Sequence, residues 1–249
     1  MALLIIVGYA LLPKNEALTS VIKPISLNGL KTTLAEATQT TDTLSSVDSI
    51  ANAVPARPTV DSTSQRILFI GDSMLEGLGR RVADYAAGNG HTIHTVCWYS
   101  SSSKIWAETD TLQYFLRQDK PTFIMICLCS NELFVRDLDQ RDAYIKTILK
   151  KIGDIPYVWI SPPNWKPDTG INDVIISNVG RKRYFDSRDL ELERGKDHAH
   201  PTFEAAAHWM DLIAEWMSNP DSTAHPILMA PTDTVVRIKN MQLLQPLRN

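Results

Sequence analysis

The sequence predicts an α/β fold in which helices cover a parallel sheet. From residue 66 onward, short apolar runs alternate with amphipathic segments of helical period. The apolar runs lack the polar alternation of a half-exposed strand, so we expect them to be buried on both faces, as strands of parallel sheets are. With 249 residues, 44% of them hydrophobic, the chain is long enough to form one sizeable core.

The expected elements alternate along residues 66–218, where we place the catalytic domain. They are strand 67–70, helix 75–87, strand 92–98, helix 108–117, strand 122–128, helix 141–152, strand 157–160, helix 171–179, strand 184–185 and helix 203–217. Active sites of parallel sheets lie at the carboxyl ends of the strands. The residues that follow each strand are therefore the first candidates for a site.

The ends of the chain predict no enzymatic chemistry. Residues 1–12 are apolar but, at ~1.5 Å per residue, too short for a ~30 Å hydrocarbon core. They are compatible with a truncated signal anchor that tethers the protein to a membrane, or with a short helix packed on the domain. Residues 13–65 read as a Ser/Thr/Pro-rich linker or stalk, and residues 219–249 as a tail without a functional assignment. An anchor and a stalk favour the cell envelope, periplasmic or extracellular, with the cytoplasm as the alternative.

Charge and cysteine content exclude some classes of function. The formal net charge is −3, without long basic runs, so we expect no nucleic-acid partner. A small molecule or a neutral polymer is the expected partner. Cys97, Cys127 and Cys129 lie in apolar runs and fit no zinc spacing, which predicts buried free thiols.

A nucleophile is predicted where the first strand ends. Gly71-Asp72-Ser73 joins this strand to a helix, so Ser73 is expected at the carboxyl edge of the sheet. There, free N–H groups and the helix dipole favour a developing anion. The alternative is that Asp72 or Ser73 only caps the helix.

A base for this serine is predicted immediately before the last helix. In Asp197-His198-Ala199-His200, an acid three residues before a histidine can fix the imidazole tautomer and leave its other nitrogen for the serine. His200 is favoured by this spacing, with His198 as the alternative. A metal site built from Asp197, His198, His200 and His208 fits no common zinc spacing, and we expect neither a metal nor a cofactor.

Asn131 follows the third expected strand, where its side-chain amide is able to donate to an oxyanion. Together, Gly71-Asp72-Ser73, Ser130-Asn131-Glu132 and the pair Asp197 and His200 resemble blocks I, III and V of the SGNH (GDSL-like) hydrolases. The resemblance covers residues 66–218. It implies a flavodoxin-like three-layer α/β/α sandwich with a five-stranded parallel sheet.

The resemblance also implies an oxyanion hole formed by the Ser73 N–H, a glycine N–H of block II and the Asn131 side chain. Two departures concern this hole. Cys129 replaces the glycine at the head of block III, and a serine run, residues 100–103, replaces the block II glycine. We expect Ser102 to supply the missing N–H.

Aromatic residues near strand ends suggest a carbohydrate surface. Trp98, Tyr99, Trp106 and Trp165 are the expected substrate contacts, with packing in the core as the alternative. The predicted function is a serine esterase that acts through an acyl-enzyme on a small acyl ester or an acetylated carbohydrate, most simply an O-deacetylase. The alternatives are an acetyltransferase with the same triad and a non-catalytic carbohydrate-binding domain.

Overall fold

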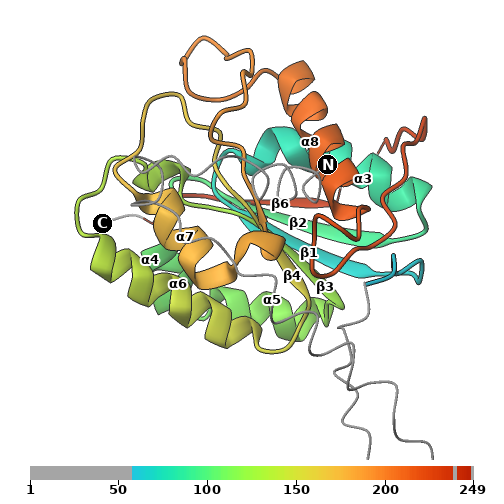
Figure 1. Cartoon of the computed structure of the whole chain (residues 1–249), viewed down its shortest axis with the longest axis horizontal. Helices are drawn as coiled ribbons and strands as arrows, with labels where there is room; N and C mark the ends of the chain where they lie inside the picture. Colours follow the sequence, from blue (N-terminus) through green and yellow to red (C-terminus); the bar gives the residue numbers. More distant parts are fainter. Residues whose placement is uncertain (1–57, 238–239, 248–249) are drawn as a thin grey trace, which may run out of the picture. The chain divides into compact units, whose positions relative to one another are not determined.

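The sheet is parallel throughout and has six strands in the order β5-β4-β3-β1-β2-β6 (Figure 1). The computed structural model describes residues 58–237 and 240–247. The predictions for residues 1–57, the apolar segment and most of the linker, lie outside these residues. The strands are β1 (Arg66–Gly71), β2 (Thr92–Trp98), β3 (Phe123–Cys127), β4 (Tyr157–Ile160), β5 (Tyr184–Phe185) and β6 (Met241–Leu244).

The sixth strand corrects the expectation of five. β6 comes from the C-terminal tail and extends the sheet beyond β2, with Thr95 opposite Met241 and Trp98 opposite Leu244. The Met241 side chain lies over α3 (Leu75–Gly88), where a Cβ on Gly79 would stand 2.4 Å from its Cε atom. The tail is therefore part of the folded unit, because it pairs with an edge of the sheet that would otherwise be open.

Helices cover both faces of the sheet, which gives the expected three layers (Figure 1). α3 and α8 (Phe203–Met217) lie on one face and contact each other. α4 (Ser103–Glu108), α5 (Thr111–Asp119), α6 (Leu138–Ile152) and α7 (Ile171–Val179) lie on the other. Two short 3₁₀ turns, η2 (Ser130–Glu132) and η3 (Arg181–Arg183), precede α6 and β5.

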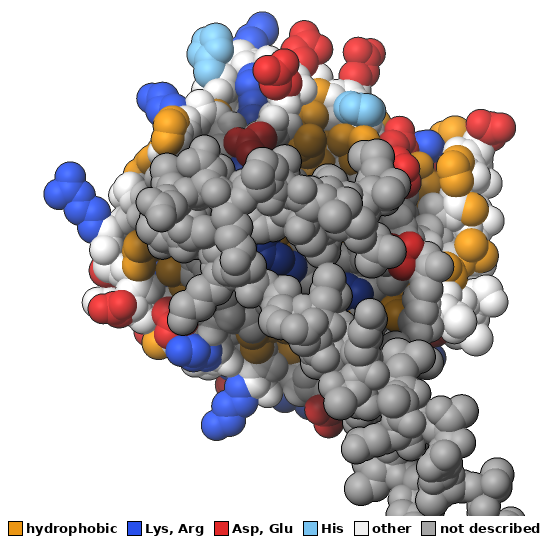
Figure 2. All heavy atoms as spheres, viewed as in Figure 1, with side chains coloured by type: hydrophobic (Ala, Val, Ile, Leu, Met, Phe, Trp, Pro, Cys, Tyr) orange, Lys and Arg blue, Asp and Glu red, His pale blue; other side chains and the backbone are white. Residues whose placement is uncertain are grey.

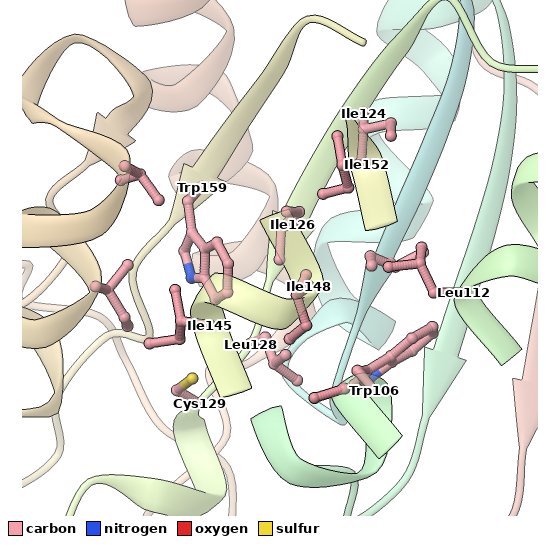
Figure 3. Close-up of a cluster of buried hydrophobic side chains, with 14 of the residues drawn as sticks. Trp106, Leu112, Ile124, Ile126, Leu128, Cys129, Ile145, Ile148, Ile152 and Trp159 are labelled. Atoms are coloured by element: carbon pink, nitrogen blue, oxygen red, sulfur yellow. The ribbon is translucent and has the colours of Figure 1, made fainter. Parts of the chain in front are cut away.

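Alternate side chains of β1 to β5 enter two separate cores. Leu68 and Ile70 pack beneath α4–α7, in the cluster that Figure 3 shows around Trp106 and Trp159. Ile67 and Phe69 pack beneath α3 and α8. Burial on both faces explains why the strand sequences are continuously apolar.

The three cysteines are free and buried, as predicted. Burial raises the pKa of the Cys97 thiol to about 12 and the pKa values of Cys127 and Cys129 well above their usual range. A thiol that stays protonated is a poor nucleophile.

The helix expected over residues 108–117 corresponds to α5, which begins at Thr111, and α4 precedes it as a helix that was not predicted. Thr109 ends α4 in an extended conformation, and its hydroxyl donates to the Ile105 carbonyl at 2.8 Å. This side-chain bond to the backbone competes with helix continuation, so α5 begins only at Thr111. At its other end, α4 begins at Ser103, inside the serine run.

The fold also begins earlier than residue 66. Gln65 is buried, its N–H donates to His91 Nδ1 at 3.1 Å, and its side-chain carbonyl accepts from Thr122 Oγ1 at 2.7 Å. Asp61 pairs with Ile227 as an isolated bridge. Within the part of the chain that the structure describes, none of the helices has both the length and the apolar character needed to cross a membrane.

Candidate active site

The turn after β1 brings Ser73 to the carboxyl edge of the sheet. β1 can end there because Gly71 lacks a side chain: a Cβ at this position would lie 2.1 Å from the Cys127 carbonyl oxygen of β3. The Asp72 N–H donates to that same carbonyl at 3.1 Å. Leu75 then begins α3, so Ser73 stands partly exposed between strand and helix.

Asp72 ties this turn to the segment after β3. Its carboxyl group is fully buried and accepts the N–H of Met74 at 3.1 Å and the N–H of Ser130 at 2.9 Å. Burial raises the pKa of Asp72 to about 6, against the lowering effect of these hydrogen bonds. The side chain therefore links the Ser73 turn to the residue before Asn131, which is more than the helix cap considered from the sequence.

Ser73, His200 and Asp197 form a continuous chain of hydrogen bonds. The Ser73 Oγ lies 2.8 Å from His200 Nε2, and His200 Nδ1 lies 2.6 Å from Asp197 Oδ2. A Ser–His–acid chain of this kind is able to move a proton from the hydroxyl to the imidazole. The structure thus brings His200 to Ser73, as the spacing favoured over His198.

A tight turn holds Asp197 and His200 in place. The Gly195 N–H donates to the His200 carbonyl at 2.8 Å, and a guanidinium N–H of Arg194 donates to the Ala199 carbonyl at 2.7 Å. Immediately afterwards, Thr202 caps α8 by accepting the Ala205 N–H at 3.2 Å. Hydrogen bonds therefore hold the backbone on either side of the His200 imidazole.

Asp197 is held in its ionised form. The N–H groups of Ala199 and His200 each donate to Oδ1 at 3.0 Å, and the imidazole contacts Oδ2. These bonds, led by that from Ala199, lower the pKa of Asp197 to about 2. A carboxylate in this state orients the imidazole and stabilises its protonated form without taking up the proton itself.

Asn131 contacts the loop that follows β2. Its Nδ2 donates to the Ser101 carbonyl at 3.0 Å. Before it, Cys129 has φ +84°, a left-handed conformation that favours glycine and explains the glycine implied at this position by the family resemblance. The segments after β1, β2 and β3 therefore meet at one edge of the sheet.

The serine run does not present Ser102 as expected. The N–H groups of Ser101 and Ser103 already donate to the Trp98 carbonyl at 3.1 Å and to Glu132 Oε2 at 2.7 Å. Within residues 58–237 and 240–247, the N–H groups of Ser100 and Ser102 have no acceptor.

The peptide between Ser101 and Ser102 is trans, so its N–H points opposite to its carbonyl. Because Asn131 binds that carbonyl, the Ser102 N–H points away from the Asn131 amide. A single oxyanion shared by Ser102 and Asn131 is contradicted by this geometry. Instead, the Ser102 hydroxyl caps α4.

Two of the four predicted substrate aromatics belong to the core. Trp106 is fully buried and donates through its indole N–H to Ser101 Oγ at 3.0 Å (Figure 3). Trp98 stacks edge-on against it and donates to the Gln245 carbonyl at 2.9 Å. Both indoles are used for packing, which corrects the expectation that they line a binding surface.

The other two aromatics are partly exposed. The Tyr99 hydroxyl donates to Glu76 Oε2 at 2.7 Å, an interaction that raises the pKa of Tyr99 to about 12. Trp165 stacks edge-on with Phe134, with ring centres 6.0 Å apart, and Phe134 is 50% exposed. Sequence reasoning did not single out Phe134, which lies three residues after Asn131.

An open depression of about 520 Å³ lies beside the loop that carries the histidines. Its lining residues are Asn164, Trp165, Leu190, Glu191, Leu192, Glu193, Arg194 and His198. Figure 2 shows acidic, basic and histidine side chains gathered at the edge of the molecule where Figure 1 places the loop between β5 and α8. Trp165 therefore contacts the half-exposed ring of Phe134 and also lines the depression that contains the charged residues.

Comparisons with known proteins place the chain in no family. No family model and no curated protein matches it. It is similar to a solved structure of a gut microbial diltiazem-metabolizing enzyme, with a TM-score of 0.45 and 12% identity over 64% of this chain. The match covers 47% of that enzyme, so it spans about half of its length. At this TM-score, the likeness carries no argument about function.

Proposed function

We propose that this protein is a serine ester hydrolase that acts through an acyl-enzyme. The observation that carries the proposal is the contact of Ser73 Oγ with His200 Nε2 at 2.8 Å, together with that of His200 Nδ1 with Asp197 at 2.6 Å. A serine hydroxyl is a weak nucleophile on its own and needs a base within hydrogen-bond distance. The residues around Ser73 supply that base and the acid that orients it.

In the proposed reaction, His200 takes the Ser73 proton as Oγ attacks the acyl carbon. The resulting imidazolium, stabilised by ionised Asp197, then gives that proton to the departing alcohol oxygen, and the acyl group stays on Ser73. Water attacks the acyl-enzyme with His200 again as base, and the acid is released as Ser73 regains its proton. The cycle requires no metal or cofactor.

The oxyanion donors we propose are the Ser73 N–H, the Asn131 amide and the Ser100 N–H. Ser100 replaces Ser102 because it is the third residue of the turn closed by the Trp98 carbonyl and the Ser101 N–H, and its φ is +57°. That position of a turn favours glycine, so Ser100 corresponds in conformation to the missing block II glycine.

The direction of the Ser100 N–H follows from the strand before it. The N–H groups of Thr95 and Tyr99 donate toward β6, to the carbonyls of Asn240 and Leu244. Successive N–H groups of an extended strand point to opposite sides. We propose that this alternation continues past the end of β2 into the turn, which directs the Ser100 N–H to the side of β1 and of the Ser73 turn.

We further propose an acetylated carbohydrate as the substrate. Trp165 and Phe134, which is three residues after Asn131, offer aromatic faces and edges, and the depression that Trp165 lines also carries the carboxylate, guanidinium and amide groups of Glu193, Arg194 and Asn164. Apolar faces next to polar groups suit a sugar ring with its hydroxyls. The cell envelope remains our proposed location, and product analysis with and without a sugar acceptor distinguishes hydrolysis from acetyl transfer.

The test is hydrolysis of a short-chain p-nitrophenyl ester by the wild type and by Ser73→Ala. We expect turnover by the wild type and none above background in the folded variant. Equal rates in the two proteins would contradict the proposal. Sugar binding without acyl release in the wild type would identify a non-catalytic domain.

A further inference from the structure

Glu132, the residue directly after Asn131, is a buried acid with a complete set of partners. Glu132 is only 2% exposed to solvent. Oε2 accepts the Ser103 N–H at 2.7 Å, and Oε1 accepts the Ser103 hydroxyl at 2.8 Å. A buried carboxyl group is costly unless it is satisfied in this way.

Arg141 of α6 supplies the opposite charge. Its Nε lies 2.8 Å from Glu132 Oε1, out of line for a hydrogen bond, so the contact is an ion pair. The other end of the guanidinium lies 3.3 Å from Asp137. The carboxylate is therefore fixed between α4 and α6.

Two neighbouring residues of η2 thus hold two points of the same loop. Asn131 Nδ2 binds the Ser101 carbonyl, and Glu132 binds the N–H and hydroxyl of Ser103. A single contact would leave the loop free to pivot about it, whereas two contacts two residues apart fix its orientation. The direction of the Asn131 amide and the path of the turn that contains Ser100 then depend on each other.

Resting on the proposed function, we propose that Glu132 is a positioning residue for the oxyanion donors. It does not touch the substrate. It holds the start of α4 at a set distance from η2, so that the Asn131 amide and the Ser100 N–H remain directed at the reacting carbonyl. An error of about 1 Å in such a donor is enough to lose much of its effect.

A stabilising core ion pair would give a different result from a positioning residue. If Glu132 only supports the fold, its replacement lowers the fraction of active molecules but leaves the turnover of each active molecule unchanged. If it positions the donors, turnover per active molecule falls while substrate affinity changes little. Counting active sites separates the two cases.

The experiment compares Glu132→Gln with Glu132→Met in the full chain. The two side chains are similar in size, and both remove the negative charge beside Arg141 Nε while leaving the Asp137 carboxylate at the other end of the guanidinium. Only glutamine is able to accept the Ser103 N–H. Active sites are titrated with a fluorophosphonate, and kcat and KM are measured for p-nitrophenyl acetate.

We expect Glu132→Met to lower kcat per titrated site about tenfold, with KM within about twofold, because the donors are displaced but not removed. Glu132→Gln should retain kcat within about threefold of the wild type. In an Asn131→Ala background, Glu132→Met should cost clearly less than its tenfold effect in the wild type, since one of the two donors that it positions is already absent.

Equal kcat per titrated site in the wild type and Glu132→Met would overturn the inference and leave the proposed function intact. Full additivity with Asn131→Ala would overturn it as well. If Glu132→Met does not fold, Ser103→Ala removes one of the same contacts and should lower kcat per site about threefold; an unchanged value there overturns the inference. A wild type that neither reacts with the probe nor turns over ester would overturn the proposed function and this inference together.

Discussion

Asn131→Ala removes a proposed oxyanion donor and, with it, the hydrogen bond to the Ser101 carbonyl at 3.0 Å. Loss of one side-chain donor to an oxyanion typically lowers kcat about 100-fold, or about 2.7 kcal/mol of transition-state stabilisation. The Ser101 carbonyl belongs to a fully buried residue and loses its donor as well, so the free energy of unfolding should fall by about 1 kcal/mol. The expected result is therefore a large change in kcat with a small change in stability.

The assay is steady-state hydrolysis of p-nitrophenyl acetate, paired with urea unfolding of the same samples. Asn178→Ala is the matched control, because Asn178 Nδ2 also donates hydrogen bonds, to Asp142 of α6 and to the Val174 carbonyl of its own helix α7, outside the segments that follow β1, β2 and β3. It should lower stability by a similar amount and leave kcat unchanged. A kcat for Asn131→Ala within about threefold of the wild type would refute the assignment of this side chain as an oxyanion donor.

Two pH-dependent predictions follow from the carboxyl groups. Because the proposed base acts in its unprotonated form, kcat/KM should rise with pH, and Asp197→Asn should retain more activity than His200→Ala. Because the pKa of Asp197 is about 2, protonation of Asp197 should add no step to the pH–rate profile above about pH 3. Activity that survives His200→Ala but not His198→Ala would contradict the assignment of the base. For Asp72, burial raises the pKa from 3.8 to about 6, so the folded state binds the proton more tightly than the unfolded state, and this group's contribution to stability falls by about 2 kcal/mol as pH rises from about 4 to about 7. The unfolding free energy of the wild type minus that of Asp72→Asn, measured at both pH values, should be lower by that amount at pH 7 than at pH 4, and a constant difference would show that Asp72 does not titrate in this range.

Most elements could be predicted because their sequences reflect local requirements. The bounds of β2, β4, β5, α7 and α8 agree with the expected ranges, and the bounds of β1, α3, β3 and α6 differ by one to three residues. Strands buried on both faces have continuous apolar runs, and amphipathic helices have a clear period. Gly71, Ser73, Asn131 and His200 could be located in the same way, because each of them lies next to the end of an expected strand or helix.

The remaining features depend on contacts between distant segments. β6 is four residues long in a tail without periodicity, and it is a strand only because β2 offers a free edge. Four consecutive serines are identical as sequence, so nothing in the run indicates that Ser100 has a positive φ or that Ser103 binds Glu132. Trp98 and Trp106 were assigned to the surface because a strand end exposes its neighbours, whereas α4 folds back and buries both indoles.

The most direct test of the account is to treat the folded protein with a fluorophosphonate probe and map the labelled peptide. The account predicts stoichiometric modification of Ser73, loss of hydrolytic activity in proportion to labelling, and strongly reduced labelling in His200→Ala, in which Ser73 is present but has lost its base. Labelling of another serine, or full activity in a protein whose Ser73 is modified, would contradict the claim that Ser73 is the nucleophile.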